Sequence, residues 1–123
     1  MNVERWGTGA KGRNHTVARG EMVWSVSNAT RPGSPFVEQV EQTLAFLDES
    51  LQKAGSSRNQ LLTVQVLLSD INERETFDEI WCRWIGNDPE RWPQRSVFQS
   101  TLAPGLNIEM IITACRESKG RSF

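Results

Sequence analysis

One periodic pattern limits the fold of this chain more than any other feature of its sequence. Between residues 35 and 54, apolar side chains recur at intervals of three and four, at Val37, Val40, Leu44, Leu47 and Leu51. Because residues three and four apart share one face of a helix, this spacing predicts an amphipathic helix with a single apolar face. We expect Ser34 to cap the helix, Pro35 to occupy its first position and Gly55 to end it. The polar side, which should face solvent, carries Glu38, Gln39, Glu41, Gln42 and Glu49.

A strand and a second helix are expected next. Residues 61–68 are apolar and rich in β-branched side chains, which predicts a central strand buried largely on both faces. Either Asn72 with Glu75 or Asp70 with Glu73 matches the spacing of a capping box at the start of the second helix. The apolar face of this helix consists of Phe77, Ile80, Trp81 and Trp84.

Strand-like segments occupy the two ends of the chain. We expect short strands at 4–6, 15–19 and 21–27, and two more at 95–101 and 107–115. Residues 117–123 are polar, and we expect this tail to fray. The predicted order is therefore three strands, a helix, a strand, a helix and two strands.

This order favours an α+β fold in one domain that spans residues 1–123. Each helix has one apolar face, so both helices are expected on the same face of a six-stranded mixed sheet, in a two-layer sandwich. Right-handed crossovers place the strands before and after each helix parallel to each other. The other face of the sheet is left bare, and we expect a partner subunit to cover it.

The balance of charges excludes several classes of partner. Lysine and arginine total 14 and aspartate and glutamate total 15, which gives a formal net charge of −1. The chain therefore lacks the basic surface that attracts nucleic-acid backbones and anionic membranes. It has no long apolar run, and an acidic residue among the first five argues against a secretory signal. We expect a cytoplasmic protein with no nucleic-acid or membrane partner, and the two distant cysteines and one histidine are too few ligands for structural zinc.

Three motifs admit two interpretations each. Residues 7–12 match the dinucleotide fingerprint G-x-G-x-x-G, but no helical pattern follows, which favours a flexible loop. His15 is compatible with a general base, although no nucleophile lies near it in sequence, which favours a polar strand residue. Trp81 and Trp84 are able to stack on a planar ligand, but their helical spacing among apolar residues favours core packing.

Arg95 and Glu109 are the charged residues most suited to chemistry. Arg95 follows Pro93 at the start of a predicted strand, where its planar guanidinium is suited to hold a carboxylate through two hydrogen bonds. Glu109 lies in an otherwise apolar strand, where an unpaired carboxylate would be costly to bury. For each residue, a structural salt bridge and a functional role are equally compatible with the sequence alone.

Taken together, these segments resemble the Rid family of reactive intermediate deaminases, also called the YjgF or L-PSP endoribonuclease-like family. The resemblance covers about residues 14–114, most of the chain. Its marks are residues 44–51 followed by Ala54-Gly55, the strand 62–68 followed by Asp70, the helix 77–84, Pro93-x-Arg95-Ser96-x-Phe98, and Ile108-Glu109.

The resemblance implies a chorismate-mutase-like fold and a homotrimer, in which the sheets form a central barrel with clefts between the subunits. It implies hydrolysis of 2-imino acids and their enamine tautomers to 2-oxo acids and ammonia, without metal or cofactor. Arg95 takes the position of the arginine that binds the carboxylate of the substrate. Glu109 takes the position of the acid that orients or activates water, so both residues are expected to be catalytic.

Several positions depart from the family pattern, which indicates a divergent branch with relaxed specificity. Val97 stands in place of the family's site cysteine, and Asp78 in place of an asparagine. Arg13 falls near the family's early tyrosine, and Val26 near a strand serine. We expect contacts with a small carboxylate-bearing substrate from Arg95, Ser96, Val97, Arg13, Val26, Asp78 and Trp81.

Two other functions remain compatible with the chain. One is a non-catalytic module that binds small carboxylates or regulates a partner enzyme, and the other is a ribonuclease, which the acidic charge balance disfavours. A last expectation concerns geometry. The strands that begin near Arg95 and Glu109 should run in opposite directions, which separates the two residues along the sheet. We therefore expect Glu109 of a neighbouring subunit to meet Arg95.

Overall fold

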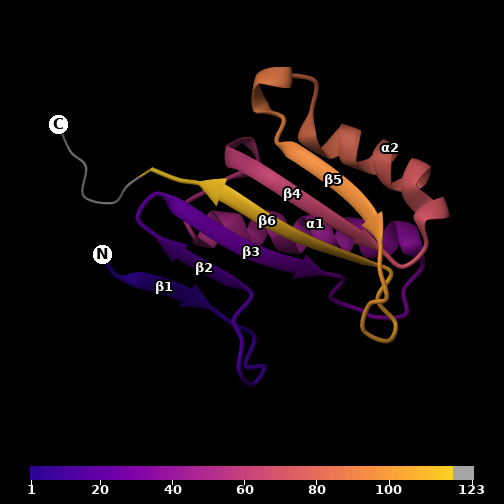
Figure 1. Ribbon diagram of the computed structural model, residues 1–123, viewed down its shortest axis with the longest axis horizontal. Coiled ribbons are helices and arrows are strands. Elements are labelled where there is room, and N and C mark those ends of the chain that lie inside the picture. Colours follow the sequence, from indigo (N-terminus) through magenta and orange to yellow (C-terminus); the bar gives the residue numbers. More distant parts are fainter. Residues whose placement is uncertain (118–123) are drawn as a thin grey trace.

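The computed structural model describes residues 1–117, which form six strands and two α-helices in the predicted order (Figure 1). The elements are β1 (Val3–Trp6), β2 (Thr16–Arg19), β3 (Met22–Asn28), α1 (Phe36–Lys53), β4 (Leu61–Leu68), α2 (Arg74–Ile85), β5 (Gln94–Gln99) and β6 (Ile108–Cys115). The tail expected to fray lies, after residue 117, outside the described residues. Neither of these helices combines the length and the apolar character that crossing a membrane would require.

All six strands form one mixed sheet in the order β1-β2-β3-β6-β4-β5. Neighbouring strands pair antiparallel except β4 and β5, which are parallel. Because β6 pairs antiparallel with both β3 and β4, those two strands are also parallel to each other. The predicted parallel orientation of the strands on either side of each helix is therefore confirmed, and β5 is an edge strand.

Both helices pack on one face of this sheet, and the hydrophobic core lies between the two layers. In Figure 1, α1 lies behind the middle strands of the sheet. Alternate residues of β6 are buried toward the helices, because successive side chains of a strand point to opposite faces. The core contains Leu44, Leu47 and Leu51 of α1, Phe77, Ile80 and Trp81 of α2, and Ile108, Met110, Ile112 and Ala114 of β6. The predicted two-layer α+β sandwich is confirmed.

The other face of the sheet is open in the single chain. Its exposed apolar side chains include Trp24, Leu62, Phe98 and Ile111. The prediction that β4 is buried on both faces is wrong for one chain, since Leu62 and Gln65 are exposed. The physical reason is that no second layer covers this side, and the open-face patch (Trp24, Leu62, Phe98 and Ile111) is where the predicted partner subunit would lie.

The polarity of α1 departs from the prediction at two positions. Val37 is 43% exposed, whereas Gln39, expected in solvent, is fully buried. The Gln39 side chain donates from Nε2 to the carbonyl of Gly105 and accepts at Oε1 from the backbone N–H of Asn107, both at 2.9 Å. The buried amide hydrogen-bonds to the backbone that leads into β6. This contact with a segment distant in sequence places Gln39 in the core, although the local periodicity predicts an exposed position.

The ends of the helices follow the predicted signals only in part. Ser34 does not cap α1, because its hydroxyl donates to the carbonyl of Arg31 and Pro35 occupies the cap position. Gly55 ends the helix as predicted, with a φ of +82° that favours glycine. Ahead of α2, Asp70 accepts from the backbone N–H of Asn72 at 2.9 Å and so caps the short 3₁₀ turn Ile71–Glu73. The cap position of α2 itself is Glu73, whose side chain makes no capping bond, so neither predicted capping box starts this helix.

Candidate functional site

The structure separates Arg95 and Glu109 within one chain. Arg95 of β5 aligns with Val64 of β4, and Glu109 of β6 aligns with Leu67. Three residues along β4 and two strand spacings place their Cα atoms about 14 Å apart. Because Val64 and Leu67 are an odd number of residues apart, Arg95 and Glu109 also point to opposite faces of the sheet. The predicted site residues accordingly divide between two places.

The first place, the Arg95 cluster, consists of Arg95, Asp78, Phe77, Trp81 and Arg74 on the helix-covered face. Arg95 donates from Nη2 to Asp78 Oδ1 at 2.7 Å. Its guanidinium carbon lies 5.3 Å from the Phe77 ring centroid and 5.4 Å from that of Trp81, at distances where a cation is attracted to an aromatic face. The Arg95 side chain is 19% exposed, so the cluster holds it beneath α2 with one edge open.

The carboxylate of Asp78 binds Arg95, the arginine that we expect to bind the carboxylate of a substrate. Its second oxygen, Oδ2, lies 3.7 Å from Arg74 Nε. Asp78 uses one of the five N–H groups of the Arg95 guanidinium. The pair is part-buried rather than sealed, so a second carboxylate would compete with Asp78 for the same fork.

Ser96 and Val97 follow Arg95 in sequence but do not join its cluster. Ser96 is exposed and aligns with Gln65, which places it on the open face. Val97 is half-buried and packs against the hydrophobic core. The strand alternation that turns Arg95 inward therefore turns Ser96 outward, and it gives Val97 a packing role within the chain.

The second place is a cavity of about 700 Å³ at the end of the sheet where β3 ends and β6 begins. We call it the Glu109 cavity. It brings together three predicted site residues, Arg13, Val26 and Glu109. The other lining residues are Thr8, Ala10, Asn14, His15, Asn28, Ala29, Thr30, Phe46, Ala103 and Leu106.

Asn28 holds the Glu109 carboxylate in this cavity. The two residues are partners across β3 and β6, and Asn28 donates from Nδ2 to Glu109 Oε1 at 2.7 Å. This hydrogen bond offsets part of the desolvation cost of placing the Glu109 carboxylate in an apolar strand. Sequence reasoning missed Asn28, although its position two residues after Val26 places both side chains on the same face of a strand.

The glycine-rich segment 7–12 lies in the loop between β1 and β2 and contributes Thr8 and Ala10 to the cavity wall. The next regular element is the strand β2, not a helix. A pyrophosphate site of the dinucleotide type needs a helix N-terminus after the last glycine. The prediction of a loop rather than a dinucleotide fingerprint is confirmed.

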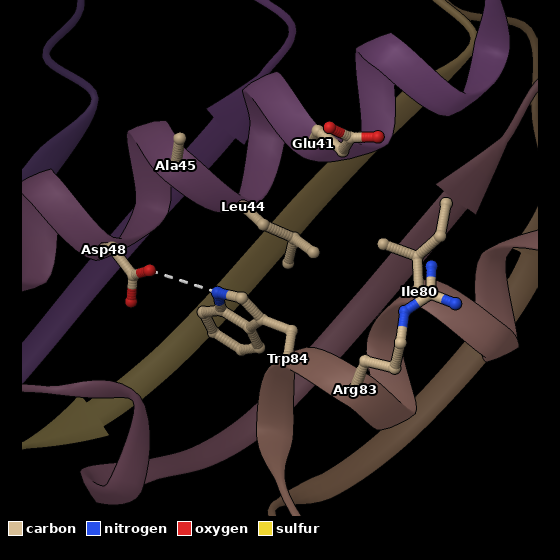
Figure 2. A pocket seen from close by; sticks show the side chains of 7 residues that line it. All are labelled: Glu41, Leu44, Ala45, Asp48, Ile80, Arg83 and Trp84. Atoms are coloured by element: carbon tan, nitrogen blue, oxygen red, sulfur yellow. Dashed lines mark hydrogen bonds between the residues drawn. The ribbon is translucent and has the colours of Figure 1, made fainter.

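A groove of about 490 Å³ runs between α1 and α2 and holds none of the predicted site residues (Figure 2). Asp48 closes one end, where it accepts from Trp84 Nε1 at 3.0 Å and pairs with Arg58. Trp81 is buried in the core and Trp84 is partly buried against it. The prediction that both tryptophans serve core packing is therefore confirmed, although Trp81 also faces Arg95.

Within residues 1–117, no group of three or more His, Cys, Asp or Glu side chains is arranged to hold a metal ion. The Glu109 cavity instead offers one carboxylate, one arginine, one imidazole and side-chain amides. Such a set is suited to bind and protonate a small polar molecule.

Comparison with known proteins places this arrangement in a described family. Residues 8–116 match the family model described as "Endoribonuclease L-PSP". A RutC family protein from Haemophilus influenzae is 31% identical over 78 residues, which cover 63% of this chain and 66% of that relative. The chain therefore spans just under two thirds of the length of that relative.

Solved structures support the same fold over nearly the whole chain. The crystal structure of an uncharacterized protein from Pseudomonas aeruginosa has a TM-score of 0.84 and 30% identity, covering 94% of this chain and 100% of that one. NMB1025, a YjgF family member from Neisseria meningitidis, has a TM-score of 0.85 at 23% identity and covers 96% of this chain and 98% of its own. The second likeness, at its lower identity, concerns the fold alone.

Proposed function

The chain belongs to the Endoribonuclease L-PSP family, and on this premise we propose that it hydrolyses reactive 2-imino acids and their enamine tautomers to 2-oxo acids and ammonia. Membership of the YjgF and RutC group supports a YjgF-type function in general, and the imine substrate is the further step. The observation that carries the proposal is the Glu109 cavity, in which a carboxylate fixed by Asn28 shares about 700 Å³ with Arg13.

The carboxylate of Glu109 is suited to the first half of the reaction. Asn28 occupies Oε1, so Oε2 remains to accept a hydrogen bond from a water molecule. As the water oxygen bonds to the carbon of a protonated imine, the C=N electron pair moves to nitrogen and Glu109 takes the released proton. The product is a carbinolamine, and a positioned base of this kind contributes about 10²- to 10⁴-fold.

We assign recognition of the substrate carboxylate to Arg95 of a second chain. Within one chain Arg95 lies across the sheet from the cavity, whereas β5 is an edge strand that another subunit can approach from the side. A guanidinium holds a carboxylate through two parallel hydrogen bonds. Asp78 contacts Nη2 only, so Nε and Nη1 keep donors for a substrate carboxylate, which competes with Asp78 for Nη2 alone.

A homotrimer is part of this proposal. The open-face patch exposes apolar side chains from β3, β4, β5 and β6, and contiguous apolar patches mark surfaces that associate. Sedimentation of the purified protein tests the assembly. We expect Ile111→Lys, in the patch, to dissociate the trimer. Val37→Lys, at an exposed valine on α1, should leave it intact, and a wild-type monomer at micromolar concentration would refute the assembly.

The activity is tested by ammonia and 2-oxo acid release from imines that an amino-acid oxidase generates in situ, with several amino acids. We expect release above the spontaneous rate with wild type and not with Arg95→Ala. Carboxylate binding without turnover would favour a binding module instead. Cleavage of RNA by wild type, with no effect on imines, would favour the ribonuclease alternative.

Mixed oligomers test the placement of the site between chains. Arg95→Ala and Glu109→Gln subunits are each expected to be inactive alone. When they exchange at random, about a quarter of the clefts should combine an intact Arg95 from one chain with an intact Glu109 from the other. No recovery in verified mixed oligomers would place both functions in one chain.

A further inference from the structure

His15, the single histidine of the chain, lines the Glu109 cavity next to the start of β2. Its backbone is fixed on both sides, because its N–H donates to the Trp6 carbonyl at 3.0 Å and its carbonyl accepts from the Val26 N–H at 2.8 Å. Its ring meets the Phe46 ring edge to face, with centroids 4.9 Å apart. The imidazole is therefore held in one orientation in a cavity that also contains Glu109.

A chain of hydroxyl groups determines which nitrogen of this ring carries the proton. Ser25 Oγ donates to the His15 carbonyl at 3.2 Å, which uses the only hydrogen of that hydroxyl. In the 2.8 Å contact between Thr16 Oγ1 and Ser25 Oγ, Thr16 must therefore be the donor. Thr16 then has only lone pairs for His15 Nδ1, 2.7 Å away, so Nδ1 carries the hydrogen.

This assignment leaves Nε2 of the neutral ring with a free lone pair. Within residues 1–117 no hydrogen bond to Nε2 is found. Burial lowers the pKa of His15 from its ordinary value of 6.5, and the positive charge of Lys53 lowers it further, while Glu49 opposes the change. Those two residues face the ring from α1, and Arg13 and Glu109 face the same cavity from the loop and from β6.

We propose that His15 is the proton-transfer residue for the second half of the reaction, an inference that rests on the proposed function. Glu109, protonated in the first step, returns its proton to the amino group of the carbinolamine. As the C–N bond breaks with its electron pair on the departing ammonia, Nε2 of His15 takes the proton of the hydroxyl group and the C=O bond forms. The imidazolium then releases its proton to solvent, which regenerates the neutral ring.

His15→Asn is the informative variant because it separates structure from chemistry. The Asn amide reaches the position of Nδ1 and keeps a donor toward Thr16, but it lacks a basic nitrogen at Nε2. We expect the variant to fold and to lose about 10²-fold or more in kcat. Wild-type kcat should fall as the pH drops below 6.5 and His15 becomes protonated, and this acidic limb should be absent from the variant.

The outcomes distinguish this inference from the function on which it rests. A wild-type protein without imine hydrolysis would overturn both. An active wild type with a His15→Asn variant of equal kcat and the same acidic limb would overturn the role of His15 alone. Loss of kcat together with loss of the acidic limb would support it.

The tautomer is measurable without any activity. Because the chain has one histidine, long-range ¹H–¹⁵N correlation spectra report on His15 without ambiguity. We expect Nδ1 to be protonated and Nε2 to be unprotonated in neutral wild type. Thr16→Val, which removes the acceptor, should shift protons to Nε2 and lower kcat, whereas Thr16→Ser should keep both wild-type properties. A wild-type ring protonated at Nε2 would overturn the inference.

Discussion

The Arg95 cluster and the Glu109 cavity each hold one charged side chain, but they differ in the group that binds it. Arg95 lies under α2, with Asp78 on one nitrogen and two aromatic rings within 5.4 Å of its guanidinium carbon. Glu109 lies at the wall of a cavity, and one neutral amide holds one of its oxygens. The arginine thus has a counter-ion from its own chain, whereas the glutamate is held by a group that leaves its charge intact.

This difference separates two kinds of functional group. A part-buried ion pair contributes little to stability once desolvation and screening are counted, so Asp78 and Arg95 can exchange partners at modest cost. A carboxylate held by an amide keeps both its charge and a free oxygen, which suits proton transfer. We therefore expect Glu109 to control the rate of the reaction and Arg95 to control affinity.

The largest expected effect is that of Glu109→Gln. Glutamine keeps the shape and a bond with Asn28 but cannot take a proton from water, so kcat should fall by about 10²- to 10⁴-fold. KM should change little. Steady-state kinetics of wild type and of Glu109→Gln measure the effect. The variant Glu38→Gln, at an exposed glutamate on α1, controls for the loss of one negative charge. Equal kcat in all three proteins would show that the cavity does not house the reaction.

The effect of Arg95→Lys should be smaller and should fall on KM. Lysine keeps the charge but loses the planar fork, which weakens carboxylate binding by about 1 to 3 kcal/mol, the worth of a charge-assisted hydrogen bond. The assembly should survive, as sedimentation would show. If the variant unfolds or dissociates while carboxylate binding persists, the Arg95 cluster is structural only.

The order of elements follows from the sequence because it depends on local periodicity. The stripe that includes Leu44, Leu47 and Leu51 predicted α1, and the β-branched run predicted β4. Periodicity failed at Val37 and Gln39, where the backbone of Asn107, distant in sequence, requires a buried amide. Local periodicity cannot predict a position whose burial depends on a hydrogen bond to residues distant in sequence.

The division of the site depended on strand register, which the sequence does not specify residue by residue. A shift of one residue would turn Arg95 to the other face of the sheet. The partnership of Asn28 with Glu109 and the hydrogen bond from Thr16 to Ser25 are likewise contacts between strands. Residue types identified the candidates, and only pairing across the sheet showed which of them meet.

Asp78→Asn sharpens the comparison with a smaller effect. Removing the internal carboxylate should free Arg95 for a substrate, and the part-exposed pair is worth about 0.2 to 1 kcal/mol, so KM should fall by a few fold. The free energy of unfolding should decrease by a similar amount. Asp88→Asn, at the exposed pair with Arg91, is the matched control. An unchanged KM would mean that Asp78 does not compete with the substrate.

The smallest expected effect is the pH dependence that His15 gives to stability. Burial and Lys53 lower the pKa of His15 in the folded chain, so the unfolded chain binds a proton more readily in acid. The contribution of His15 to the free energy of unfolding is therefore complete above pH 6.5 and is lost as the pH falls from 6.5 through the folded-state pKa.

Urea unfolding of wild type and His15→Asn at several pH values tests this dependence. Plots of the free energy of unfolding against pH for the two proteins should converge or cross on acidification. Lys53→Met removes the positive charge that lowers the pKa of His15 in the folded chain. In this variant the loss of stability should begin at the same pH as in wild type but end at a higher pH. Parallel curves for wild type and His15→Asn would show that the ring is not desolvated, and the cavity would then present an ordinary surface histidine.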